Sequence, residues 1–204
     1  LQRCALDLPA KPSKPQLIFA IIKAWRLVKP LTRAQLLALP VVHDERLCAT
    51  MSILLALEQS AFSIDQELFV YVVAIHARLV LEHGYHQTAI DSLAQLAFAL
   101  VAMGKVAEAG RLALDTIALA DLHGNVISRP SAEGVRLMFV GPSTQPFRDC
   151  AAPMELNHRR TLELGDRLSA GFQASLALAL HLEACTHLAE LRGLFERFHA
   201  LHED

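Results

Sequence analysis

The chain has 204 residues, 53% of them hydrophobic, and a formal net charge of -2 at pH 7. This composition supplies enough apolar side chains for a buried core, so the fold needs no metal or disulfide for its stability. A pI of about 6.6 gives no basic surface of the kind that nucleic-acid-binding proteins carry, which excludes nucleic acid as the leading partner.

Residues 1–15 contain prolines and lysines and show no hydrophobic period. They predict an extended leading segment, without the apolar core of a signal peptide. An amphipathic helix is expected over 16–29, with Trp25 as a core or docking anchor. Thr32 and Gln35 then have the spacing of a capping box, which predicts a short helical turn.

Two aspartates are expected to start the next helices. Asp44 can cap a helix over 45–59 and Asp65 a helix over 65–83, because a carboxylate at the N-cap accepts hydrogen bonds from the unpaired N–H groups of the first turn. Gly84 supplies the stop, since glycine readily adopts the backbone conformation that ends a helix.

Helical patterns continue to the end of the chain, over 87–103, 106–122, 132–140, 147–164, the segment after Gly165–Asp166, and 188–201. Prolines interrupt 126–153, where we expect a loop over 141–146 and a bent helix after it. No run of residues has the alternation of a strand. The sequence therefore predicts an all-α fold.

The apolar segments bear on location and on partners. The longest, such as 69–81, are interrupted by histidine or arginine before about 18 residues, the minimum for a spanning helix, so no membrane span is expected. The mean hydropathy of +0.32 is high and implies apolar surface that a neighbouring domain or a second copy of the chain covers. The chain does not begin with Met, and we expect a segment of a longer cytoplasmic protein.

The segment 93–115 raises the question of nucleotide binding, because its Gly104–Lys105 pair is what ends a phosphate-binding loop. Such a loop needs GxxxxGK followed by serine or threonine, after a strand. Here Ala99 takes the place of the first glycine, Val106 follows the lysine, and the preceding residues are helical in pattern. We therefore interpret the pair as the turn of a helix hairpin.

This hairpin fits the helix-turn-helix repeat of about 34 residues found in tetratricopeptide proteins. The matching positions are Leu93, Leu96, Ala97, Leu100, Gly104, Val106 and Ala109. The small alanines let the two helices approach, and the glycine permits a left-handed turn. A weaker second match has its turn at Gly165 and Asp166. We expect such hairpins to stack into a right-handed superhelix, since one pair cannot bury its apolar face alone.

Neither the four cysteines nor the ten histidines form a recognisable metal motif. The cysteines are Cys4, Cys48, Cys150 and Cys185, with no CxxC pair, and we expect buried, reduced thiols. His83 lies near His86, and His181 lies one helical turn from Cys185, but neither pair has further ligands at metal-site spacing. We interpret these histidines as structural and expect no metal, cofactor or catalytic residue.

The succession of motifs resembles the helical-repeat region of very large bacterial and fungal signalling proteins. The segments that carry the resemblance are "LDLPAKPSKPQL", "TRAQLLALPVVHDERLCATMSIL", "LVLEHGYHQTA", "AMGKVAEAGRLALDTI" and "LELGDRLSAG". Those proteins join a serine/threonine kinase-like domain, an AAA or STAND-type ATPase, this region, and GAF, PAS, histidine kinase or cyclase output modules. The resemblance covers essentially the whole chain and implies a two-component signalling context.

In that family the corresponding landmarks are structural: Leu39, Pro40 and Asp44 open the repeat array, and His83–Gly84 and Gly165–Asp166 are turns. We divide the chain into 1–30, the leading segment plus the first helix, and 31–204, a single helical-repeat domain. None of the landmarks is catalytic.

Two functions are open. The first is a non-catalytic regulatory scaffold that binds other proteins or neighbouring domains and passes a signal between the ATPase and an output kinase. The second is a sensor in which Arg136, Arg159 and Arg160 line an internal apolar pocket for a small-molecule effector.

Overall fold

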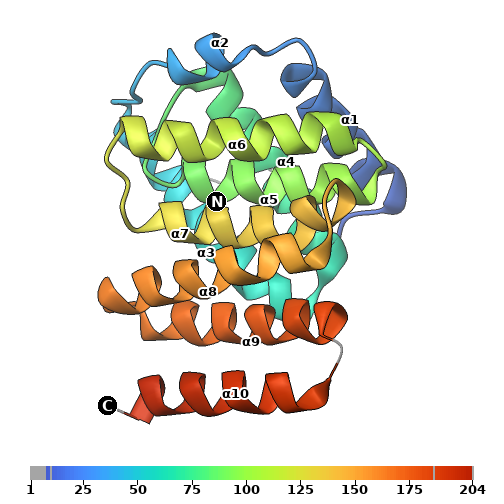
Figure 1. Ribbon diagram of the computed structural model, residues 1–204. Coiled ribbons are helices and arrows are strands. Elements are labelled where there is room, and N and C mark those ends of the chain that lie inside the picture. Colours follow the sequence, from blue (N-terminus) through green and yellow to red (C-terminus); the bar gives the residue numbers. More distant parts are fainter. Residues whose placement is uncertain (1–7, 10, 186, 204) are drawn as a thin grey trace.

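The structure, a computed structural model, describes residues 8–9, 11–185 and 187–203. Within these ranges the chain is all-α, as expected, and an isolated bridge between Val41 and Tyr85 is the one extended pairing. Most helices pack on their neighbours in the sequence (Figure 1), but the first two pack on later helices. Whether hairpins of this kind continue as a right-handed superhelix stays a prediction.

The helices are α1 (Lys14–Val28), α2 (Arg33–Leu37), α3 (Glu45–Ile64), α4 (Gln66–His83), α5 (Ala89–Ala102), α6 (Val106–Leu122), α7 (Ser128–Val135), α8 (Phe147–Glu163), α9 (Arg167–Ala184) and α10 (Leu188–Glu203). A π-helical turn, η2 (Arg136–Val140), continues α7, and a 3-10 turn, η3 (Gly141–Ser143), follows it. Most of the expected helices are therefore present with ends close to those expected.

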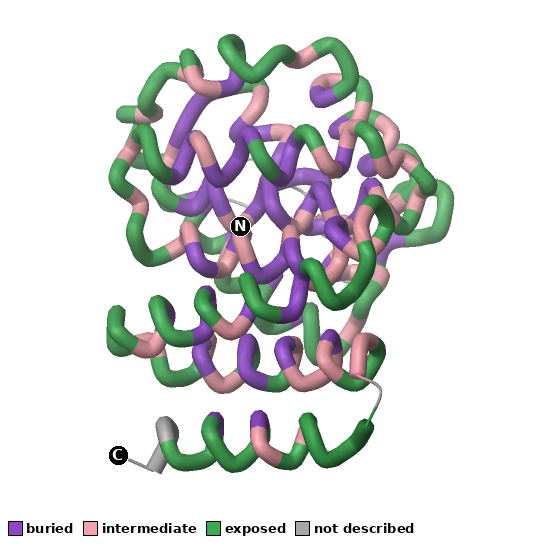
Figure 2. Tube along the Cα trace, in the orientation of Figure 1, coloured by how far each residue is buried: buried purple, intermediate pink, exposed green. Residues whose placement is uncertain are grey.

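The buried apolar residues form two clusters. The larger is built from α1 to α7, and the smaller from α8, α9, α10 and part of η2. The turn η2 joins them, because its Val140 belongs to the larger cluster and its Leu137 to the smaller. In Figure 1, α8, α9 and α10 lie as successive layers below the larger part, and Figure 2 shows that α10 is mostly exposed.

The predicted caps are confirmed. The N–H of Leu47 donates to Asp44 Oδ1 over 2.9 Å, and that of Leu68 donates to Asp65 Oδ1 over 3.0 Å. Helix α3 runs beyond its expected end, up to Ile64, because only the cap of α4 at Asp65 interrupts the chain there.

The α5–α6 hairpin has the geometry expected of its sequence. Gly104 has φ of 72°, which a glycine adopts without steric cost. Leu93, Leu96, Ala97, Leu100 and Ala109 are fully buried, and Val106 is half-buried. The ammonium of Lys105 lies 4.8 Å from the centre of the Trp25 ring, a cation–π contact that ties the turn to α1.

The α8–α9 hairpin is fastened to α7 by buried side chains. Its turn has Gly165 at φ of 79°, and Asp166 caps α9 by accepting from the N–H of Ser169. Asn157 donates to the Pro130 carbonyl over 2.7 Å and to Gln173 over 2.9 Å. These bonds fix the smaller cluster against the larger one.

The proline-rich region differs from expectation in three ways. The helix expected over 132–140 begins at Ser128 and contains Pro130. A proline is tolerated there because the N–H groups in the first turn of a helix have no hydrogen-bond acceptor within the helix. Its last part, η2, is π-helical. The expected loop at 141–146 starts with the 3-10 turn η3.

One described helix, α3, is long and apolar enough to cross a membrane, judged by length and composition alone. In the structure it contributes Met51, Leu54 and Ala61 to the larger apolar cluster and carries the buried Glu58. The absence of a membrane span stays a prediction.

Candidate functional site

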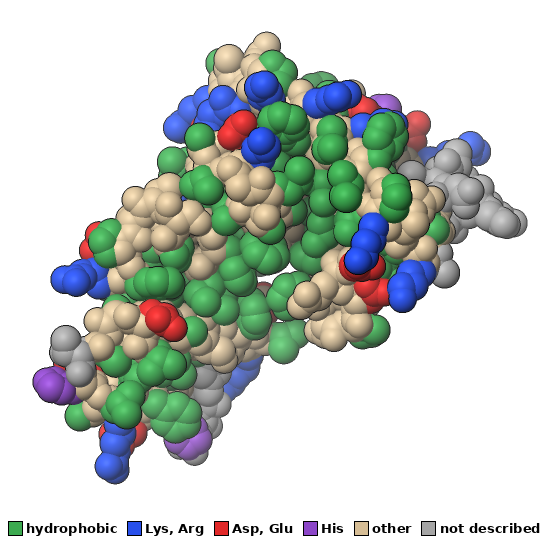
Figure 3. Space-filling model, turned by 90° about the vertical axis from the view of Figure 1, so that its right-hand side faces the viewer, with side chains coloured by type: hydrophobic (Ala, Val, Ile, Leu, Met, Phe, Trp, Pro, Cys, Tyr) green, Lys and Arg blue, Asp and Glu red, His purple; other side chains and the backbone are tan. Residues whose placement is uncertain are grey.

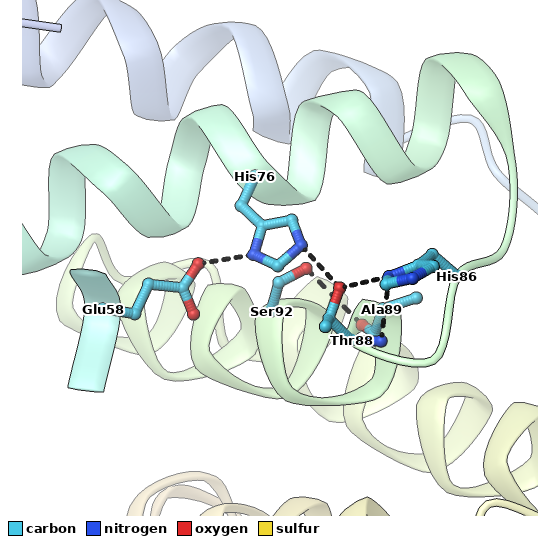
Figure 4. Close-up of polar contacts among 6 residues, drawn as sticks. All are labelled: Glu58, His76, His86, Thr88, Ala89 and Ser92. Carbon is cyan, nitrogen blue, oxygen red and sulfur yellow. Dashed lines mark hydrogen bonds and ion pairs between the residues drawn. The ribbon is translucent and has the colours of Figure 1, made fainter. Parts of the chain in front are cut away.

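A row of polar side chains crosses the interior between α3, α4 and the start of α5 (Figure 4). His76 of α4 stands at its centre. Its Nδ1 lies 2.8 Å from Glu58 Oε1, and its Nε2 lies 3.0 Å from Thr88 Oγ1. The same hydroxyl lies 3.0 Å from His86 Nδ1. The row therefore runs Glu58, His76, Thr88, His86.

The first three members of this row are buried. Glu58 is 2% exposed, His76 0% and Thr88 5%. The Thr88 hydroxyl has one proton, so it donates to one imidazole ring and accepts from the other. Burial, followed by the nearby His76, lowers the pKa of His86. Because buried polar groups are costly without partners, this row links the three helices in a single arrangement.

A second carboxylate lies beside the row. The pKa of Asp91, on the first turn of α5, is raised from 3.8 to about 6, mainly by burial and to a smaller extent by the Glu58 charge. Hydrogen bonds from Ser128 and Ser131 of α7 and the nearby His76 act in the opposite direction. Two carboxylates from different helices thus share one poorly solvated region.

Both carboxylates line a cavity of about 420 Å³. Its polar lining includes Glu58, Gln59, Asp91, Gln95, Ser131 and Ser169, and its apolar lining consists of Leu55, Phe62, Phe69, Leu168 and Phe172. These residues come from α3, α4, α5, α7 and α9, so the α8–α9 hairpin completes a site that α3 to α5 begin. The volume lies in the range of small-molecule sites, and one face of the molecule is visibly hollowed among hydrophobic side chains (Figure 3).

Three phenylalanines form one wall of the cavity. The ring of Phe62 meets that of Phe69 edge-on at 5.2 Å and that of Phe172 edge-on at 6.2 Å between centroids. Phe62 and Phe172 are partly exposed, and the neighbouring Leu168 is 88% exposed. The mouth of the cavity is therefore rimmed by apolar side chains.

One carboxylate oxygen of Glu58 has no hydrogen-bond donor among the described residues. Its Oε1 is bonded to His76, whereas Oε2 is buried and has no hydrogen-bond partner among the described residues. Since a buried acceptor without a donor is unfavourable by about 1 to 3 kcal/mol, a donor from a bound molecule would be stabilising here.

The arginines that we expected at a pocket lie elsewhere. Arg136 is half-buried and bonded to Glu133, with Nη2 at 2.7 Å from Oε1, while Arg159 and Arg160 are exposed. None of the three is among the residues that line the cavity.

His181 and Cys185, which lie one helical turn apart, each have a hydrogen-bond partner of their own. His181 Nε2 lies 2.7 Å from Glu155 Oε1, and its neighbour Cys185 donates to the Leu182 carbonyl. No group of three His, Cys, Asp or Glu side chains close enough to hold a metal is found in the described part of the chain.

The thiols are less buried than expected. Cys150 is buried and free, whereas Cys48 and Cys185 are free but only half-buried, because they lie near helix ends, where the packing is incomplete. Cys4 lies outside the described residues.

Sequence reasoning missed Glu58, Thr88 and Asp91, and used His76 only as an interruption of an apolar segment. The signal was present: Glu58 and His76 each stand alone among apolar residues, in "LLALEQ" and "VVAIHARLV". An ionisable residue on an apolar helix face is rarely buried without a partner.

The fold and the cavity define an all-α protein with an acidic, aromatic-walled pocket. No protein-family model matches the chain, and neither a curated protein nor a solved structure matches it significantly.

Asp91 provides a pH test of this region. Because its pKa is about 6 in the folded chain and 3.8 ordinarily, the folded state holds a proton that the unfolded chain has released between these values. The free energy of unfolding should therefore fall as pH rises from 4 to 6.5. In the unsubstituted protein we expect this fall in the free energy of unfolding to be about 2 kcal/mol, a value reduced to allow for the partial exposure of the side chain. The variant Asp91→Asn should not show it.

Urea unfolding of the two proteins at a series of pH values measures this effect. The other ionisable groups of this region remain in both proteins, so the difference between the curves reports on Asp91. A difference that stays constant from pH 4 to 7 would contradict the raised pKa.

Proposed function

We propose that the chain is a non-catalytic regulatory module that binds a small molecule in the cavity between α3 and the α8–α9 hairpin. The observation that carries this proposal is the combination of the unpaired, buried Glu58 Oε2 with an open, aromatic-walled cavity of about 420 Å³. Such a convergence of a few polar groups in an otherwise apolar pocket is typical of ligand sites.

The contacts at the row favour binding over catalysis. Glu58, His76 and Thr88 have the residue types of a carboxylate–histidine–hydroxyl triad, in which the hydroxyl attacks the substrate. Here Thr88 is almost fully buried, and neither it nor His76 is among the residues that line the cavity. A substrate in the cavity would meet the carboxylates and phenylalanines, but not the hydroxyl.

The location of the cavity supports a regulatory role. Its wall combines a helix of the larger cluster with a helix of the smaller one, since Phe62 lies on α3 and Phe172 on α9. A ligand held there contacts both parts and stabilises one arrangement of them over others. In the signalling proteins that the sequence resembles, such a change would pass to neighbouring domains in the cytoplasm.

A thermal-shift screen of small metabolites tests the proposal. We expect at least one compound to raise the Tm by about 5 °C or more at a concentration 100-fold above its Kd, because it binds only the folded chain. The variant Leu55→Trp, which fills the cavity, should lose this response.

Leu114→Trp is the matched control, since Leu114 is 55% exposed on α6 and does not line the cavity. A stabilising compound that acts equally on Leu55→Trp would place its site elsewhere. A broad screen with no stabilising compound would contradict small-molecule binding.

A screen without a stabilising compound would favour a scaffold that binds other proteins, and one feature of the structure supports that function. Helices α9 and α10 form an apolar groove of about 400 Å³, lined by Leu178, Ala179, Leu182, Leu191 and Phe195 with the stem of Arg192. A groove between two packed helices suits an amphipathic helix of a neighbouring domain. In that case the module works by protein–protein contact.

A further inference from the structure

The charge of the cavity restricts what it can hold. Its lining contains two carboxylates, Glu58 and Asp91, and no lysine or arginine. The imidazole of His76 faces Glu58 from the side opposite the unpaired Oε2. Anions would therefore meet two like charges in a poorly solvated space, which disfavours them.

The two carboxylates differ in their donors. Asp91 accepts hydrogen bonds from the hydroxyls of Ser128 and Ser131, whereas the buried Glu58 Oε2 has no partner in the described part of the chain. A neutral apolar molecule would exclude water from both carboxylates and leave Glu58 Oε2 without a donor. An ammonium group supplies up to three N–H donors together with the opposite charge.

A metal ion fits the cavity poorly. Divalent cations with oxygen ligands prefer six or more of them, and the described residues provide no cluster of three acidic or histidine side chains. The same cavity is also lined by three aromatic rings, those of Phe62, Phe69 and Phe172. Aromatic faces attract organic cations and accept an apolar body at the same time.

We infer that the cavity binds a small organic amine in its ammonium form, with the cationic head between Glu58 and Asp91 and an apolar or aromatic body against Phe62, Phe69 and Phe172. This assignment rests on the proposed function and names the class of ligand. The exposed Phe172 and Leu168 at the mouth then cover the outer end of the ligand.

Isothermal titration of the full chain at pH 7.5 with three matched compounds tests the inference. The compounds are 2-phenylethylamine, a cation at this pH, 2-phenylethanol, which is neutral, and 3-phenylpropanoate, an anion. We expect the amine to bind at least tenfold more tightly than the alcohol, and the anion to show no binding at millimolar concentration.

Variants locate the binding. Asp91→Asn and Glu58→Gln are each expected to weaken amine binding tenfold or more, and Phe62→Leu several-fold. Glu45→Gln is the control, because Glu45 is exposed at the first turn of α3, roughly 20 Å along the helix from Glu58. If circular dichroism shows that Glu58→Gln does not fold, Asp91→Asn decides alone.

The outcomes separate the inference from the function it rests on. If the alcohol or the anion binds as tightly as the amine, the cavity is a ligand site but the assignment to amines is overturned. If amine binding survives Asp91→Asn unchanged, or if the amine does not bind at millimolar concentration, the assignment is also overturned. The metabolite screen then decides whether the cavity binds any small molecule.

Discussion

Replacing His76 with leucine is expected to lower the free energy of unfolding by about 3 kcal/mol, because the change leaves a buried carboxylate without its hydrogen-bond partner. The change leaves Glu58, which is 2% exposed, without a partner on either carboxylate oxygen, because Oε2 already has none. It also removes the ring that lies 3.0 Å from the Thr88 hydroxyl. Urea unfolding followed by circular dichroism measures the loss.

A double-mutant cycle shows whether the pair is the cause. The variant with Glu58→Leu and His76→Leu removes both polar groups, so its loss of stability should be clearly smaller than the sum of the two single losses. His43→Leu, at an exposed histidine before α3, should change stability by no more than about 0.5 kcal/mol. Strict additivity of the two single changes would mean that the contact contributes nothing to stability.

Replacing Gly84 with alanine is the second large effect, with an expected loss of about 3 kcal/mol or more. Gly84 ends α4 with φ of 123°, and a Cβ built there would lie 2.1 Å from the Pro40 carbonyl oxygen. That carbonyl accepts a hydrogen bond from the N–H of Tyr85 over 2.7 Å. It therefore cannot move away from the new Cβ without breaking this hydrogen bond. Thermal and urea unfolding measure the cost.

Gly104→Ala is the matched comparison. Gly104 also has a positive φ, of 72°, but a Cβ there would meet no atom within 4 Å. Only the backbone strain remains, which amounts to about 1 kcal/mol. Equal losses for the two variants would show that the contact with Pro40 has no steric effect.

Local signals predicted the helices well because capping is a local interaction. Asp44 and Asp65 bond to N–H groups three residues ahead, and the glycine turns depend on the conformation of one residue. The start of the helix around Pro130 was harder to predict from the sequence, because this helix is held by Asn157 and Gln173 from the α8–α9 hairpin. Those partners are distant in sequence and override the local effect of the proline.

The candidate site was not predicted, and the reason is distance along the chain. Glu58 and His76 could each be noticed as polar residues on apolar helices, but their pairing depends on the rotation of α3 against α4. The aromatic wall brings Phe62 beside Phe172, two residues that lie on different helices and far apart in the chain. The three arginines chosen from the sequence were selected for their charge, whereas the packing placed carboxylates at the cavity.

The sequence by itself determined the all-α class, the helix starts at Asp44 and Asp65, and the hairpin turn at Gly104, since each depends on hydrophobic period or on contacts within a few residues. The tertiary structure decided the pairing of Glu58 with His76, the pKa of Asp91 and the acidic cavity. These depend on which helix faces meet and how much water they exclude, and that is set by packing between segments far apart in the chain.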